Sequence, residues 1–136
     1  MIKFLLDTDT CSYAMRRSRS HTALLARLRA HPLAEQAVSV VTAAELLFGT
    51  KLATARAKAT DDYQRFIRHL AVLEWGADAA EHYADIRADL QRKGTPIGAN
   101  DLLIAAHARS LGVTLVTNNV REFARVKGLK VDNWFR

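Results

Sequence analysis

Short apolar segments alternate along this chain with longer stretches in which apolar residues recur at helical spacing. Continuous apolar runs occupy residues 2–6 (IKFLL), 37–41 (AVSVV), 71–75 (AVLEW) and 113–117 (VTLVT), with a weaker candidate at 129–134. These runs are apolar at nearly every position, so both faces of each predicted strand are buried. Such strands are typical of a parallel sheet that helices cover on both faces.

Helical spacing predicts the segments between the strands. The predicted helices are residues 20–31, 42–59, 61–70, 77–94, 100–112 and 121–126. Pro32, Gly94 and Gly112 end three of them. Residues 100–112 are apolar nearly all round, which predicts a buried helix. We therefore expect residues 1–136 to form a single α/β domain, with a mainly parallel sheet of four to five strands flanked by helices on both faces.

Polar residues stand where several of these segments begin or end. Asp7 ends the first predicted strand, Glu45 lies just after the second, Asp101 opens the buried helix, and Asn119 follows the fourth strand. Ligands of parallel sheets bind beyond the carboxyl ends of the strands, so we expect these side chains to converge there. Carboxylates held close together repel each other unless a cation neutralises them. An all-oxygen set favours Mg²⁺ or Mn²⁺ over zinc.

The same residues also have structural interpretations. Thr42 and Glu45 match a capping box, in which each side chain bonds the backbone amide of the other. Asn119 and Glu122 form a second possible capping box. Asn100 or Asp101 is a suitable N-cap for its helix. From spacing alone, both the structural and the functional interpretations stay open.

Composition narrows the class of protein. The chain of 136 residues carries 20 Lys and Arg against 14 Asp and Glu, a net charge of +6, which favours an anionic partner such as nucleic acid. A single cysteine, Cys11, excludes an internal disulfide and fits a reducing cytosol, and we expect it to be a small buried side chain. No window approaches the ~20 apolar residues of a membrane span. We expect a cytoplasmic protein without membrane association. We also expect His107, which lies within the predicted buried helix, to be packed in the core.

The stretch LLDTDT resembles the Asp-x-Asp-x-Thr motif of haloacid-dehalogenase-type phosphatases. That resemblance implies a phosphorylated nucleophile at Asp7 and an acid at Asp9. The later acidic motif of that family is incomplete here, because Ala99 stands at its first acidic position and no suitable lysine precedes it. A second alternative is a catalytically inactive RNA-binding module.

Four segments resemble PIN-domain ribonucleases of the VapC toxin type, in the right order and at the right spacing. They are KFLLDTDTCSY, SVVTAAELLFG, RKGTPIGANDLLIAAHA and VTNNVREFARVKGLKVDNW. The last two are most similar to the enteric branch, whose members cleave initiator tRNA in the anticodon loop. The resemblance covers nearly the whole chain. It implies a metal-dependent endoribonuclease that serves as the toxin of a type II toxin–antitoxin pair.

Carried over by position, the resemblance implies that Asp7, Glu45 and Asp101 are catalytic and bind Mg²⁺, with Mn²⁺ as an alternative. Asn119 falls on a fourth catalytic position, where many relatives have Asp. For Asp9 the resemblance implies a supporting role next to the metal ligands, without direct contact to the ion. The implied partners are an RNA substrate, most specifically tRNA, a cognate VapB-type antitoxin and a second copy of the chain. Exposed apolar positions on helices within residues 43–70 are the expected antitoxin surface.

Overall fold

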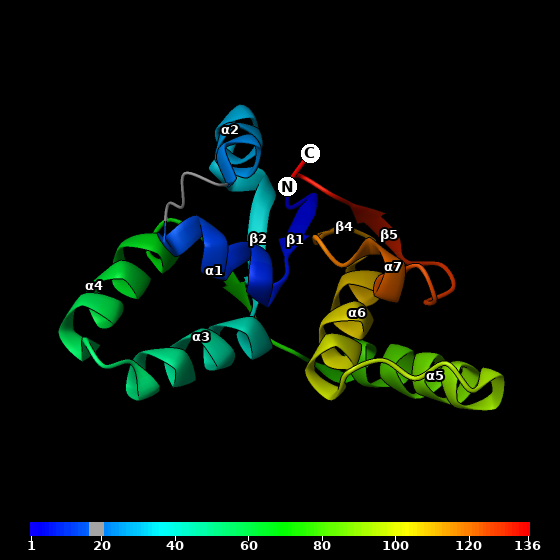
Figure 1. Ribbon diagram of the computed structural model, residues 1–136. Coiled ribbons are helices and arrows are strands. Elements are labelled where there is room, and N and C mark those ends of the chain that lie inside the picture. Colours follow the sequence, from blue (N-terminus) through cyan, green and yellow to red (C-terminus); the bar gives the residue numbers. More distant parts are fainter. Residues whose placement is uncertain (17–20) are drawn as a thin grey trace.

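A computed structural model describes residues 1–16 and 21–136. Its centre is one parallel sheet with the strand order β3-β2-β1-β4-β5 (Figure 1). The strands are β1 (Phe4–Leu6), β2 (Gln36–Ser39), β3 (Ala71–Leu73), β4 (Thr114–Val116) and β5 (Lys130–Asp132). The parallel α/β architecture predicted from the apolar runs is confirmed, with the fifth strand formed from the weaker candidate segment.

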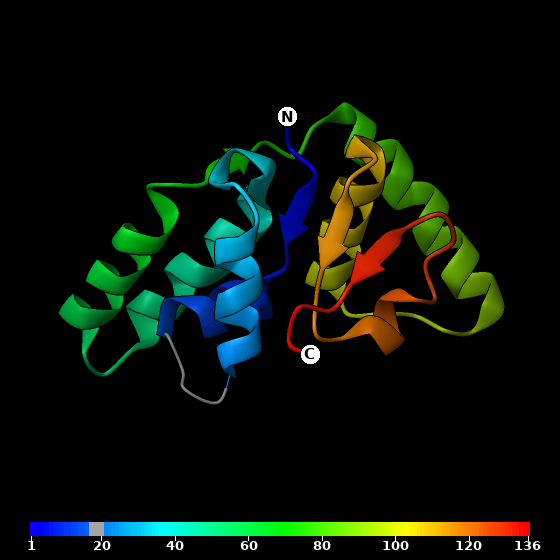
Figure 2. The same cartoon turned by 90° about the horizontal axis from the view of Figure 1, so that it is seen from above.

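Seven α-helices and one 3₁₀ helix are found in the described residues. They are α1 (Thr8–Arg16), α2 (Thr22–Ala30), the 3₁₀ helix η2 (Leu33–Glu35), α3 (Val40–Leu52), α4 (Arg56–Ile67), α5 (Ala77–Lys93), α6 (Ala99–Leu111) and α7 (Val120–Phe123). Helices α1 to α4 lie on one side of the sheet and α5 to α7 on the other (Figures 1 and 2). Among the described residues, no helix has the length and apolar character to cross a bilayer.

Successive residues of the central strands enter two different cores. Leu5 of β1 and Leu115 of β4 pack with α5, α6 and α7, whereas Leu6 and Val116 pack with α1 to α4. This division follows from the two-residue period of a strand, which sends neighbouring side chains to opposite faces. Both faces are buried, which is why the strands read as continuous apolar runs.

Trp134 closes the core on the side of α1 to α4. Its ring is fully buried, stacks on His31 with the ring centres 4.5 Å apart, and meets Phe4 edge-on. The indole N–H donates to Asp132 Oδ2 at 3.0 Å, and the Arg27 guanidinium lies over the ring. These contacts hold the segment around Trp134 against α2 and β1.

Several predicted boundaries are wrong. The helix expected over 42–59 ends at Leu52, and α4 begins at Arg56. Helix α1 was not predicted, because residues 8–16 carry only a short apolar stripe of Cys11, Ala14 and Met15 among polar residues. The predicted helix 121–126 is the single turn α7, and Ser20, the expected start of α2, lies outside the described residues. The ends at Gly94 and Gly112 are confirmed, since both adopt the left-handed conformation with φ of 68°.

Thr42 does not begin α3, and it forms no capping box with Glu45. The N-cap is Ser39, whose Oγ accepts a hydrogen bond from the Val41 amide at 3.1 Å. The same hydroxyl lies 2.8 Å from Nδ1 of His107 on α6, and His107 is buried as expected. Burial lowers the pKa of His107, so its ring is neutral. Since the ring also bonds the Glu74 backbone, its Nδ1 is left to accept a hydrogen bond from the Ser39 hydroxyl. The start of α3 is thus fixed to α6.

Candidate active site

Asp7 is the most buried acid at the carboxyl edge of the sheet. It directly follows β1, its amide donates to the Val116 carbonyl at 3.1 Å, and its side chain is only 4% exposed. Its Oδ1 accepts a hydrogen bond from the Thr10 amide at 2.9 Å in the first turn of α1. Burial raises the pKa of Asp7, while bonds from Thr10 and Thr117 act in the opposite direction. The carboxylate therefore orders the turn from β1 into α1.

Asp101, in the first turn of α6, lies beside several other acids. Burial and the negative charge of Glu122, followed by those of Asp7 and Asp9, raise the pKa of Asp101 to about 7. The carboxyl groups of Asp101 and Glu122 also share a hydrogen bond. At neutral pH Asp101 is therefore partly protonated, and a bound cation would take the place of that proton.

Glu45 projects from the second turn of α3 and is held by two side chains. Its Oε1 accepts a hydrogen bond from the Thr8 hydroxyl at 2.7 Å, and its Oε2 accepts one from Asn100 Nδ2 at 3.0 Å. Thr8 follows Asp7 in the chain and Asn100 precedes Asp101. The structure therefore links Glu45 to the neighbours of both other predicted acids.

Asn119 lies at the start of α7 and contacts Glu122 rather than capping the helix. Its Nδ2 donates to Glu122 Oε2, and the Asn119 side chain makes no cap hydrogen bond. The second oxygen of Glu122 accepts from the Gly98 amide at 3.0 Å. The capping-box interpretation of residues 119–122 is therefore wrong. The Asn119 amide and the 94–98 loop position Glu122 instead.

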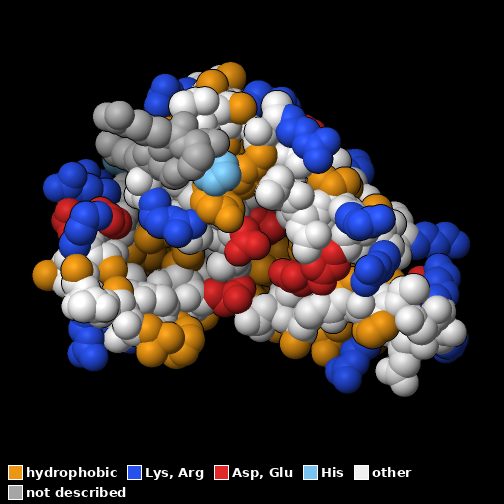
Figure 3. Space-filling view, viewed as in Figure 1, with side chains coloured by type: hydrophobic (Ala, Val, Ile, Leu, Met, Phe, Trp, Pro, Cys, Tyr) orange, Lys and Arg blue, Asp and Glu red, His pale blue; other side chains and the backbone are white. Residues whose placement is uncertain are grey.

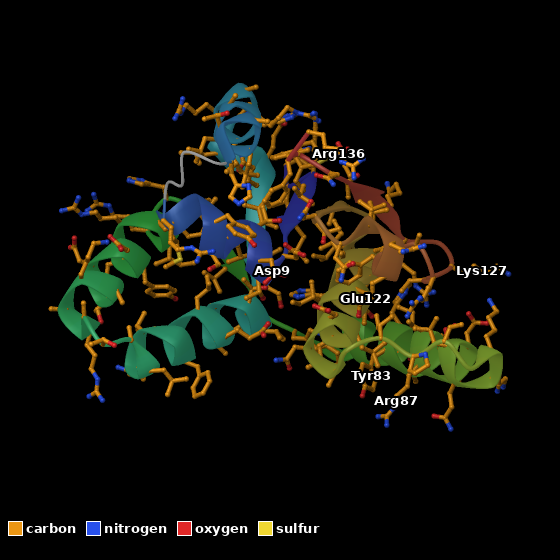
Figure 4. The ribbon with its side chains drawn as sticks, in the orientation of Figure 1. Asp9, Tyr83, Arg87, Glu122, Lys127 and Arg136 are labelled. Carbon is orange, nitrogen blue, oxygen red and sulfur yellow. The ribbon has the colours of Figure 1, made fainter. Side chains whose placement is uncertain are left out.

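The structure brings all four predicted residues to the carboxyl edge of the sheet, and it places Glu122 beside them. Glu122 was missed because a capping box and a site acid give the same sequence pattern. The available signal was its position in the first turn of the helix that follows β4. Figure 4 shows Asp9 on α1 and Glu122 on α7, both near the middle of the face of the molecule at which the strands end.

The donor set fits a hard divalent cation, because carboxylate and amide oxygens dominate it. Within residues 1–16 and 21–136, no three Asp, Glu, His or Cys side chains are close enough together to form a complete cage. An ion bound at this edge would therefore complete its coordination with water or with small side-chain movements. The raised pKa of Asp101 supports the fit, since a cation would relieve the repulsion among these acids.

Cations surround the acidic edge. In Figure 3, Asp and Glu side chains gather in a hollow at the middle of the face, and Lys and Arg side chains lie on both sides of it. With a net charge of +6, this arrangement suits a polyanion that passes over a small acidic centre.

Comparisons with known proteins agree with this geometry. Residues 4–129 match the PIN domain family. Over 134 residues the chain is 38% identical to the tRNA(fMet)-specific endonuclease VapC of Salmonella typhimurium, covering 98% of this chain and 99% of that protein. It is 37% identical to Ribonuclease VapC2 of Haemophilus influenzae, with the same coverage.

Solved structures give the same result. DNA-bound VapBC from Salmonella typhimurium superposes with a TM-score of 0.89 at 38% identity, over 98% of this chain and 99% of that chain. VapBC2 from Rickettsia felis, bound to a promoter DNA fragment, gives a TM-score of 0.85 at 34% identity with the same coverage. The phosphatase and the inactive RNA-binding module find no support among these relatives. PIN-domain nucleases generally use a divalent metal ion. The fold, the acidic edge and the relatives together show that this chain belongs to the PIN-domain family, among the VapC-type ribonucleases of toxin–antitoxin pairs.

Proposed function

We propose that this protein is a Mg²⁺-dependent endoribonuclease that cuts tRNA, with the anticodon loop of initiator tRNA as its specific target, and that acts as the toxin of a type II toxin–antitoxin pair. The observation that carries the proposal is the convergence of Asp7, Asp101 and Glu122 at one sheet edge, with Glu45 bonded to the neighbours of the first two. The tRNA target is supported by a relative that is named a tRNA(fMet)-specific endonuclease.

In the proposed mechanism, Asp7 and Asp101 would hold the ion, with Glu45 and Glu122 beside them. A divalent ion there would lower the pKa of a water molecule and neutralise charge on the phosphodiester. Glu45 orients the attacking water through its fixed carboxylate. Asn119 keeps Glu122 directed at Asp101, and the surrounding cations bind the RNA backbone.

Attack by water, rather than by the ribose 2′-hydroxyl, leaves 5′-phosphate and 3′-hydroxyl ends. We would incubate the purified protein with tRNA and Mg²⁺, with and without chelator, and sequence the ends of the fragments. Cleavage that persists in chelator, or a 2′,3′-cyclic phosphate among the products, would refute the metal-assisted mechanism. Cleavage outside the anticodon loop would refute only the specific target.

Asp7→Asn is the sharpest single substitution at the site. We expect RNA cleavage to fall by about 100-fold or more, because the variant loses an ionised group that serves the reaction. The fold should persist, since an asparagine oxygen can still accept the Thr10 amide hydrogen bond. A folded variant, checked by circular dichroism, that cuts RNA at the parental rate would contradict the assignment of Asp7.

We further propose that the protein works in the cytoplasm as a homodimer and is neutralised by a VapB-type antitoxin. Apolar side chains on α3 support a protein partner, because Leu47, Phe48 and Leu52 are 40%, 63% and 70% exposed. These residues lie within the segment predicted to bind the antitoxin. Co-expression with the antitoxin, followed by measurement of the mass of the complex, tests both partners.

A further inference from the structure

The two oxygens of the Glu45 carboxylate are held by two residues that have no assigned role. The Thr8 hydroxyl donates to Oε1 at 2.7 Å, and Asn100 Nδ2 donates to Oε2 at 3.0 Å. The Thr42 hydroxyl, one turn before Glu45 on α3, lies 3.2 Å from that of Thr8. Three separate elements, α1, α3 and α6, therefore meet at this carboxylate.

The two donors occupy informative positions in the chain. Thr8 is the first residue of α1, directly after Asp7, and Asn100 is in the first turn of α6, directly before Asp101. A shift of Glu45 relative to either acid would stretch one of these hydrogen bonds. Together they fix the distance and orientation of Glu45 with respect to both Asp7 and Asp101.

Neither side chain is required for local structure. The Thr10 amide in the first turn of α1 is bonded by Asp7, and the N-cap of α6 is Gly98, where no side chain makes a cap hydrogen bond. Asn100 is exposed, so water would satisfy its amide if Glu45 did not. Exposed and half-buried hydrogen bonds contribute little net stability, because water competes for the same donors and acceptors. The bonds to Glu45 therefore call for a role beyond folding.

We propose that Thr8 and Asn100 are positioning residues, which hold the Glu45 carboxylate in place over the Asp7 and Asp101 pair for phosphodiester cleavage. The inference rests on the proposed ribonuclease function. Residues that orient the groups around a metal site typically change ion affinity or activity by about 10-fold to 100-fold when they are replaced. Thr8 and Asn100 act through Glu45 and do not themselves contact the reacting atoms.

The test compares Thr8→Val and Asn100→Ala with the parent protein. For each variant we expect kcat for RNA cleavage to fall by about 10-fold to 100-fold, with KM changed less than about 2-fold, because the RNA-binding surface is intact. Thr8→Ser keeps the hydroxyl and should restore most of the rate. Thr60→Val, on the exposed surface of α4, is the matched control and should leave the rate unchanged.

A second measurement does not depend on cleavage. Mg²⁺ titration followed by calorimetry should show weaker binding to Thr8→Val and to Asn100→Ala, approaching the affinity of Glu45→Gln. In the Glu45→Gln background, adding Thr8→Val or Asn100→Ala should produce no further loss of rate, since the group that they position is already altered. Full additivity of these losses would overturn the proposal, as would parental kcat and Mg²⁺ affinity in both single variants.

The outcomes separate this inference from the function on which it rests. If the parent protein does not cut RNA, the ribonuclease proposal fails, while the Mg²⁺ titrations still test the positioning of Glu45. If the parent cuts RNA and the variants match it in both measurements, the function stands and the positioning role fails. A large fall in the melting temperature of Thr8→Val or Asn100→Ala would show that these residues serve the fold, which also contradicts the proposal.

Discussion

At the scale of single residues, Asp101 carries the clearest electrostatic signature. Its pKa rises from an ordinary 3.8 to about 7 because of burial and the charges of Glu122, Asp7 and Asp9. A carboxyl group with a raised pKa stabilises the fold while it is protonated. That contribution is lost as the pH rises from the unfolded value of 3.8 through about 7.

Asp101→Asn should therefore stabilise the metal-free protein at pH 8. We expect a gain of about 1 kcal/mol after allowance for solvent screening, which is a melting temperature higher by about 3–4 °C. The gain should disappear below about pH 3, under the unfolded value of 3.8, where Asp101 is protonated in both states. Thermal unfolding in chelator at the two pH values measures it. A loss of stability at pH 8 would show that the negative charge of Asp101 is compensated within the protein.

Added Mg²⁺ should reverse the order of stability of the parent protein and Asp101→Asn. An ion that binds only the folded state raises its stability in proportion to the logarithm of its concentration. The parent protein should therefore gain melting temperature with added Mg²⁺, and Asp101→Asn should gain much less.

At the scale of elements, the start of α3 sets the position of Glu45. The Ser39 hydroxyl caps α3 and also bonds His107 on α6, so one side chain joins the helices that carry Glu45 and Asp101. The chain turns from β2 into α3 without a loop, because Ser39 is both the last residue of the strand and the cap. The position of the acid on α3 thus follows directly from the sheet.

Ser39→Ala should destabilise the protein by about 1–3 kcal/mol. It removes a helix cap and leaves the buried His107 nitrogen without its donor. Urea unfolding measures the loss, and Ser110→Ala on α6 is a matched control, since its half-buried hydroxyl bonds only the carbonyl of its own helix. Equal midpoints for the two variants would mean that the link between α3 and α6 contributes no stability.

The sequence allowed most elements to be predicted, but not all of the site. Continuous apolar runs identify buried strands, and Gly94 and Gly112 end helices by the same physics in any fold. Helix α1 escaped prediction because the Asp7 side chain, rather than an apolar stripe, fixes its first turn. Glu122 and Asn100 fitted capping patterns equally well, and only the three-dimensional contacts show which acid each of them faces.

At the scale of the whole molecule, the positive charge surrounds an acidic centre, which predicts salt-sensitive RNA binding. Affinity for a nucleic acid falls steeply with salt concentration when Lys and Arg neutralise phosphates. Arg121 is exposed on α7, next to Glu122, so it is placed to contact a phosphate near the proposed cleavage point.

Arg121→Ala should weaken tRNA binding and reduce the slope of log affinity against log salt by about 1. The measurement uses the Asp7→Asn background, so that the RNA stays intact during titration. Arg92→Ala, exposed in the last turn of α5, is the control at a site away from the acidic centre. An unchanged slope in Arg121→Ala would place the RNA path elsewhere on the surface.

The strand order has a consequence for how such a protein is made. Strand β1 leaves the ribosome first, yet its partner β4 is more than a hundred residues later in the chain, and Glu122 comes later still. An unfinished polypeptide therefore lacks part of the acid set and one flank of the central strand. The protein can therefore become an active nuclease only when its translation is nearly complete. A neutralising partner that is made before that point can bind the protein as soon as it folds.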